Sequence, residues 1–282
     1  MSVTIMMHRG LSLRKSLSYV GASRGSYYYR TKRTRNDRGK MRDPSMLPTV
    51  KEVALRKPVY GSRMLAAVLS RELGRPVSRK LVQHAFRIMG WTMPQMTKKQ
   101  LIGATHVKPK PTGIDQDWET DFTYVWCGAD KWCYLFSVLD IFSREWIAYA
   151  FSPNAGKDNA ILAGVKAVER HPEASGKVRL WSDNGSQYIS HAFDESVDAL
   201  RLDHKYIAYH KPEDDPYIES FHGKFKREYI WTRDFQTFQE AEQAIAEACI
   251  DYNQNRPHSS LGYKTPYEFL TSIAKNVGGQ AS

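Results

Sequence analysis

Three acidic residues of this 282-residue chain lie at positions whose local sequence suggests a specific role for the carboxylate. Asp121 falls in the middle of the alternating stretch WETDFTYVW, an expected strand in which a carboxylate is costly unless something pairs with it. Asp183 follows the run VRLWS, at a strand end where α/β sheets commonly hold ligands. Glu219 lies in the first full turn of a helix that Asp215 would cap and Pro216 would begin. Carboxylates gathered at one point would suit a hard divalent cation, Mg²⁺ or Mn²⁺.

Each acid also has an ordinary explanation. Asp121 could form a salt bridge, Asp183 could shape the Asp-Asn-Gly turn that it opens, and Glu219 could be a solvated helix residue. Their combination favours chemistry, because 35 residues separate the second acid from the third and the first lies on the opening strand. Lys226, two helical turns after Glu219, projects from the same face. Asp140 is a weaker candidate ligand, since its position at a strand end is typical of a turn.

The elements around these acids indicate an α/β core. The expected strands are short and bounded by turn residues, at about 118–126, 131–142, 144–151, 178–181 and 204–207. The expected helices have apolar positions at helical spacing, at about 158–169, 187–200, 216–230 and 238–253. Three meandering strands followed by alternating helices and strands predict a mixed sheet flanked by helices.

Charge is distributed unevenly along the chain. Residues 1–110 hold 24 Lys and Arg against 4 Asp and Glu, whereas residues 111–282 hold 17 against 26, within a total net charge of +11. The basic front half is typical of a segment that holds a polyanion. Within it, leucine spacing at about 11–20 and the tyrosines at 27–29 suggest two short helices, with a solvated basic arm as the alternative.

A second pair of helices is predicted just ahead of the core. The first runs over about 62–73, the second begins after Ser78 as N-cap, and each ends at a glycine. This outline is a helix-turn-helix, whose second helix commonly presents its first residues to DNA, here Arg79 and Lys80. The alternative is an ordinary helical hairpin with a basic, solvated face.

These patterns divide the chain into five expected parts. Loops around Pro44 and Pro48 and a Lys- and Pro-rich stretch before residue 117 supply the boundaries. The parts are a basic N-terminal helical segment at 1–45, a helix-turn-helix domain at 46–96, a basic linker at 97–116, the catalytic core at 117–272 and a flexible tail at 273–282.

Several other classes of protein are disfavoured. The three cysteines give no even disulfide framework and do not lie at zinc-finger spacing to any histidine. The longest apolar run, 132–142, is too short to span a bilayer, and the N-terminus lacks the apolar core of an export signal. We therefore expect a soluble, cytoplasmic protein that is nucleoid-associated when bound to DNA, with no membrane partner.

Six blocks of the sequence resemble, in order, those of the transposases encoded by the second reading frame of insertion-sequence-three elements. The helix-turn-helix block is YGSRMLAAVLSRELGRPVSRKLVQHAFRIMGW, and the core blocks are WETDFTYV, LDIFSREWIAYA, WSDNGSQY, YIESFHGKFKRE and DYNQNRPHSSLGYKTPYEFL. The resemblance runs from about residue 10 to residue 270. The spacing of the three acids is similar to the Asp, Asp, Glu triad of the retroviral-integrase-like polynucleotidyl transferases, which have an RNase H-like core.

The resemblance implies that Asp121, Asp183 and Glu219 are the catalytic residues and the metal ligands. Two Mg²⁺ or Mn²⁺ ions, about 3.5–4 Å apart, would then serve an in-line displacement. Water would cleave a strand at the element end, and the exposed 3′-OH would attack another phosphodiester. One block departs from the family pattern: Asp214-Asp215-Pro216 replaces Asp-Asn-Ala and adds a negative charge near Glu219.

The implied substrate is double-stranded DNA, both the terminal repeats of an element and its target. Lys226 would lie near substrate phosphate, and further DNA contacts are expected from basic residues of the helix-turn-helix and of the helix after Glu219: Arg63, Arg79, Lys80, Lys224 and Arg227. A homo-oligomer on DNA and the protein of an upstream reading frame are the other expected partners.

Two rival functions use the same residues differently. An RNase H-type nuclease would use the same metals on RNA–DNA hybrids and would not need a helix-turn-helix. A catalytically decayed element or DNA-binding regulator would bind DNA without Mg²⁺-dependent strand transfer.

Overall fold

The computed structural model describes residues 12–20, 43–91, 111–207 and 216–278. Its contacts divide the chain into two units, one of Met1–Glu52 with Lys80–Thr92 and one of Val53–Arg79 with Met93–Ser282. None of the helices in these described ranges combines the length and apolar character that a membrane span requires.

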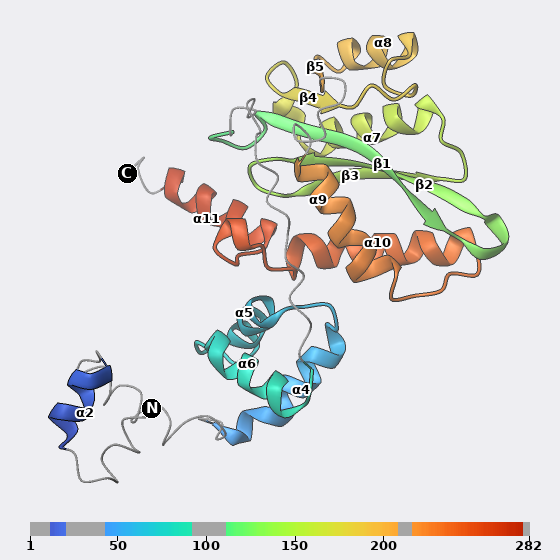
Figure 1. Cartoon of the computed structure of the whole chain (residues 1–282). Helices are drawn as coiled ribbons and strands as arrows, with labels where there is room; N and C mark the ends of the chain where they lie inside the picture. The colour runs from blue at the N-terminus through green and yellow to red at the C-terminus, as the bar shows by residue number, and fades with distance from the viewer. Residues whose placement is uncertain (1–11, 21–42, 92–110, 208–215, 279–282) are drawn as a thin grey trace. The chain divides into compact units, whose positions relative to one another are not determined.

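A mixed five-stranded sheet forms the centre of the second unit, in the order β3-β2-β1-β4-β5 (Figure 1). Its strands lie close to their predicted positions: β1 Asp117–Trp126, β2 Trp132–Asp140, β3 Trp146–Ser152, β4 Arg179–Ser182 and β5 Asp203–Tyr206. The first three strands pair antiparallel, whereas β4 pairs parallel to both β1 and β5. The predicted mixed sheet is confirmed.

Helices cover both faces of the sheet (Figure 1). Trp118 of β1 is buried in an apolar cluster with α7 (Lys157–Arg170) and α8 (His191–Ala199). Val125, of opposite parity on the same strand, is buried in a second cluster with α9 (Pro216–Phe225) and α10 (Phe238–Gln254). Successive side chains of a strand point to opposite faces, so Glu119 and Asp121 face α9, as Val125 does.

Residues 47–56 form a helix, α4 (Leu47–Arg56), whose first residues fall in the loop expected around Pro44 and Pro48. A short 3₁₀ turn, η1 (Pro44–Met46), precedes it. The loop prediction is wrong at Pro48, which lies in the first turn of α4. In the first turn of a helix the missing N–H of proline has no intrahelical partner to lose.

The last helix of the described residues continues past residue 273, where a flexible tail was expected. This helix, α11, spans Pro266–Gly278, so the predicted boundary falls inside it and is wrong. Thr265 and Glu268 form a reciprocal capping box, with the Glu268 N–H 3.1 Å from Thr265 Oγ1 and the Thr265 N–H 2.8 Å from Glu268 Oε2. The stretch TPYE carried this start signal, and it was missed.

The predicted helix pair ahead of the core is present. Helix α5 spans Ser62–Glu72 and α6 spans Arg79–Ile88, each within about a residue of its predicted start. Gly74 and Gly90 follow them with φ of +61° and +71°, the left-handed backbone that ends helices. In the N-terminal segment, α2 spans Leu13–Val20, whereas the second helix predicted through 27–29 and the linker at 97–110 lie outside the described residues.

Candidate active site

Asp121 and Asp183 are brought level with each other by the parallel pairing of β1 and β4. The register places Trp118 opposite Leu180 and continues one residue further along both strands. Asp121 lies three residues after Trp118, and Asp183 lies three residues after Leu180. Asp121 lies on the central strand with a side chain that is 21% exposed, and its Oδ1 accepts the Phe122 N–H at 2.7 Å.

Asp183 opens a turn at the end of β4 and also faces the site. Its Oδ1 accepts the Gly185 N–H at 2.9 Å, which fixes the carboxylate against the turn. A Cβ at Gly185 would lie 2.9 Å from that same oxygen and would collide with the end of the Gln187 side chain, so a larger residue here would have to displace one or both. The turn explanation and the chemical one are therefore compatible, because the turn orients the acid.

Helix α9 is attached to β1 at two points that match in spacing. Glu119 is fully buried, and its Oε2 accepts the N–H of Ile218, in the first turn of the helix, at 2.8 Å. One turn later, His222 Nδ1 lies 3.4 Å from Asp121 Oδ2. Four helical residues rise about 6 Å, and two strand residues span about 6.6 Å. This match sets α9 along β1 and carries Glu219, between the two attachment points, toward Asp121.

The charges of the three acids influence one another. Burial raises the pKa of Asp183, and the negative charge of Asp121 raises it further against the Gly185 hydrogen bond. Burial likewise raises the pKa of Glu219, with Asp121 adding to the rise and His222 opposing it. Lys226 is half-buried, and burial lowers its pKa although Asp121 opposes the fall. The charge of Asp121 thus acts on the pKa of all three other groups, Asp183, Glu219 and Lys226.

The donor set suits a hard cation. All three side chains offer carboxylate oxygens, and their mutual repulsion is the kind that a bound divalent ion relieves. Their oxygens do not lie within 4.8 Å of one another as a set, unlike a tighter group of His, Asp and Glu that occurs elsewhere in the described part of the chain. The three acids are therefore arranged around Asp121 but not closed onto a single point.

The tighter group, Asp115, His171 and Glu173, has another explanation. His171 Nδ1 lies 3.0 Å from Asp115, and its Nε2 lies 3.3 Å from Glu145 Oε2. Burial opposes protonation, but hydrogen bonds to the two acids prevail and raise the pKa of His171 to about 10. An imidazolium has no lone pair to offer a metal, so His171 belongs to an ion-pair network with Asp115 and Glu145 rather than to a metal site.

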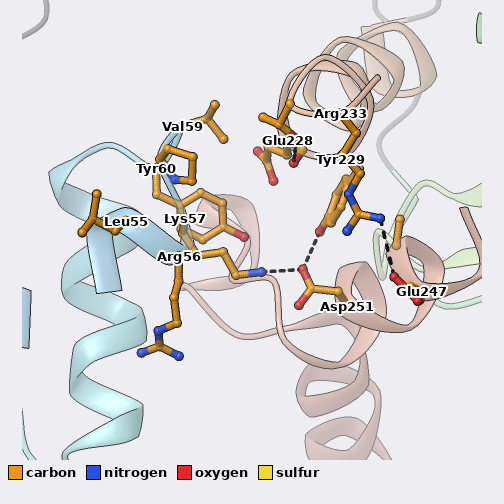
Figure 2. Close-up of a pocket in the computed structure, with 13 residues that line it drawn as sticks. Leu55, Arg56, Lys57, Val59, Tyr60, Glu228, Tyr229, Arg233, Glu247 and Asp251 are labelled. Carbon is orange, nitrogen blue, oxygen red and sulfur yellow. Dashed lines mark hydrogen bonds and ion pairs between the residues drawn. The ribbon is translucent and has the colours of Figure 1, made fainter. Parts of the chain in front are cut away.

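A cavity of about 480 Å³ is lined by the 55–60 segment, by residues 228–233 and by α10, and none of the three acids lines it. Figure 2 shows Lys57 and Tyr229 converging on Asp251: the lysine nitrogen and the tyrosine hydroxyl lie 2.7 and 2.9 Å from Asp251 Oδ2. The charged side chains of the lining pair with one another, Lys57 with Asp251 and Arg233 with Glu247. The cavity therefore contributes polar contacts within the second unit and is separate from the candidate active site.

The basic residues predicted to contact DNA are mostly accessible. Arg63, Arg79, Lys80 and Arg227 are exposed, and Arg79 is the first residue of α6. Lys224 is only partly exposed, and its pKa is lowered by burial and by the charges of neighbouring arginines. The DNA contacts of these residues stay a prediction.

Two residues of the site were missed from the sequence, Glu119 and His222. Each stands close to a predicted acid, Glu119 two residues before Asp121 and His222 three residues after Glu219. The period-2 alternation of the strand and the i,i+3 spacing of the helix were the signals that put them on the same faces. The predicted cap of α9, Asp215, lies outside the described residues.

Known proteins resemble the chain over most of its length. Two family models, both described as integrase core domain, match residues 111–212 and 200–266. The transposase InsD of insertion element IS2 from Escherichia coli is 29% identical, over 83% of this chain and 81% of its own. An uncharacterized 31.7 kDa protein of insertion element IS407 from Burkholderia multivorans is 28% identical, over 92% and 90%. The integrase core models and these relatives together support an insertion-element transposase of the retroviral-integrase-like superfamily.

The fold of the chain also resembles that of a chain in a solved viral intasome. The chain matches one in the simian T-cell lymphotropic virus intasome, solved in complex with PP2A regulatory subunit B56 gamma, with a TM-score of 0.50 and 16% identity. The match covers 78% of this chain and 73% of the other. At that identity the likeness concerns the fold alone, and it agrees with the expected RNase H-like core. The relatives do not favour an RNase H-type nuclease.

Proposed function

We propose that Asp121, Asp183 and Glu219 are the catalytic residues of this transposase and together hold its divalent metal ions. The observation that carries the proposal is the shared position of Asp121, whose charge acts on both other acids. Three elements far apart in sequence, β1, the turn after β4 and helix α9, converge there. A structural protein gains nothing from gathering like charges, whereas a metal-dependent enzyme requires it.

The metals proposed are two Mg²⁺ or Mn²⁺ ions, because the ligands are all carboxylate oxygens. When bound, such a pair activates the attacking oxygen and stabilises the leaving oxygen of an in-line displacement. The chain itself orients the ligands: the Gly185 N–H holds Asp183, and buried Glu119 holds the first turn of the helix that carries Glu219.

The proposed reaction has two stages on double-stranded DNA. Water first cleaves a strand at the end of the element, and the resulting 3′-OH then attacks a phosphodiester of the target. No covalent protein intermediate is needed, so no serine or tyrosine nucleophile is assigned. The relatives named as transposases of insertion elements support this substrate class.

DNA would be held chiefly by the basic front of the chain, where Lys and Arg exceed Asp and Glu by 20 over residues 1–110. Arg63, Arg79 and Lys80 are the proposed contacts of the helix-turn-helix, and Lys226 with Lys224 and Arg227 would contact phosphate near the acids. We further propose a homo-oligomer on DNA acting in the cytoplasm; a role for the upstream reading-frame protein rests on the sequence resemblance alone.

The proposal is tested by strand transfer of pre-cut element ends in Mg²⁺. Glu219→Gln removes a charge without changing the size of the side chain and should lower the rate at least about 100-fold. Glu242→Gln, the same change at an exposed residue of α10, serves as the matched control and should keep the wild-type rate. Equal rates for Glu219→Gln and the wild type would remove Glu219 from the catalytic residues.

A further inference from the structure

His222 is a buried histidine that the proposed chemistry leaves without a role. Its side chain is 8% exposed, on the face of α9 that carries Glu219. Its Nδ1 lies 3.4 Å from Asp121 Oδ2, and its Nε2 is buried without a hydrogen-bond partner in the part of the chain that the structure describes. Burying an unpaired ring nitrogen costs free energy, which a purely structural position would avoid with an apolar residue.

The two oxygens of Asp121 are constrained by different groups. The main-chain N–H of Phe122 donates to Oδ1 at 2.7 Å, whereas His222 of α9 approaches Oδ2. A carboxylate cannot donate, so the histidine must carry its hydrogen on Nδ1 to favour this contact. The Glu119 bond to Ile218 fixes the first turn of α9, and this leaves His222 little freedom to move away along β1.

We infer that His222 is a positioning residue whose Nδ1–H orients the Asp121 carboxylate for the metal ions. This inference rests on the proposed function, because it gives Asp121 the role of the ligand that the ions share. Partners outside the ligand set commonly fix ligand orientation in this way, and their loss typically costs about 10- to 100-fold in metal affinity or activity.

The test compares side chains that separate ring volume from the donor. His222→Phe keeps an aromatic ring and removes the N–H, whereas His222→Asn carries an amide nitrogen at the position of Nδ1 and can still donate. Mn²⁺ binding to the full chain is measured by titration calorimetry, together with strand transfer. His222→Phe should weaken Mn²⁺ binding by about 10- to 100-fold, and His222→Asn should recover most of that loss.

His258→Phe is the matched control, because His258 is equally buried, packs against Tyr252 and contacts none of the three acids; it should bind Mn²⁺ as the wild type does. Wild-type affinity in His222→Phe, or equal weakness in the Phe and Asn variants, would overturn the inference. Asp121→Asn distinguishes failure of the inference about His222 from failure of the proposed function. If Asp121→Asn weakens Mn²⁺ binding while His222→Phe does not, only the inference fails. If Asp121→Asn also binds normally, the proposed function fails with it.

Discussion

Removing the carboxylate of Glu119 should loosen the helix that carries Glu219. Glu119 is fully buried on β1, and its Oε2 accepts the Ile218 N–H at 2.8 Å, in the first turn of α9. Glu119→Ala would leave that N–H unpaired in the interior and would remove a negative charge from the positive end of the helix. The helix would then be held on β1 mainly by apolar packing and by the contact of His222 with Asp121.

The size of the effect follows from these two losses. A hydrogen bond to a charged group contributes about 1.5–3 kcal/mol, and a charge at a helix terminus adds about 0.3–2 kcal/mol. We therefore expect Glu119→Ala to lower the free energy of unfolding by about 2–5 kcal/mol. For a unit of this size each kcal/mol shifts the melting temperature by about 2–4 °C, so Tm should fall by about 4–20 °C.

Urea and thermal unfolding followed by circular dichroism measure this change, alongside the rate of strand transfer. Glu119→Gln keeps an oxygen that can accept the Ile218 N–H and should lose less stability than Glu119→Ala. Glu173→Ala removes an exposed acid and should change the free energy of unfolding by less than about 0.5 kcal/mol. If Glu119→Ala is as stable as that control, the buried carboxylate does not hold α9 and the reasoning is refuted.

Two further predictions concern His171 and Gly185. Because the pKa of His171 is raised from 6.5 to about 10, its ion pairs stabilise the fold fully below pH 6.5, and this contribution is lost as the pH rises through about 10. His171→Gln should therefore cost on the order of 3 kcal/mol at pH 7. In urea unfolding that deficit should shrink toward pH 10, and a constant deficit would contradict the pairing. Gly185→Ala places a methyl group 2.9 Å from Asp183 Oδ1. The displaced carboxylate should slow strand transfer by up to about 100-fold. An unchanged rate would show that the turn does not orient Asp183.

The strands and two of the acids were predictable because their signals are local. Alternation marks β1, and Asp121 stands out within it as the wrong kind of residue for a strand. Asp183 stands directly behind a short apolar run, so its place at a strand end follows from the run itself. The mixed character of the sheet follows from the meander and from the alternation of helices and strands after it.

The parts that sequence reasoning missed depend on contacts between distant segments. Glu119 and Ile218 are 99 positions apart, and nothing near either residue in the sequence predicts their hydrogen bond. The contact between His222 and Asp121 likewise depends on how α9 lies along β1. The loop expected around Pro48 is an error of another kind, because this proline lies in the first turn of α4, where proline is tolerated.

Anomalous scattering from crystals of the full chain soaked in Mn²⁺ would locate the metal ions directly. We predict manganese peaks within coordination distance of Asp121, Asp183 and Glu219, and weaker peaks there in crystals of Asp121→Asn. Manganese bound instead at Asp115 and Glu173, with none at the three acids, would contradict the assignment of the catalytic site.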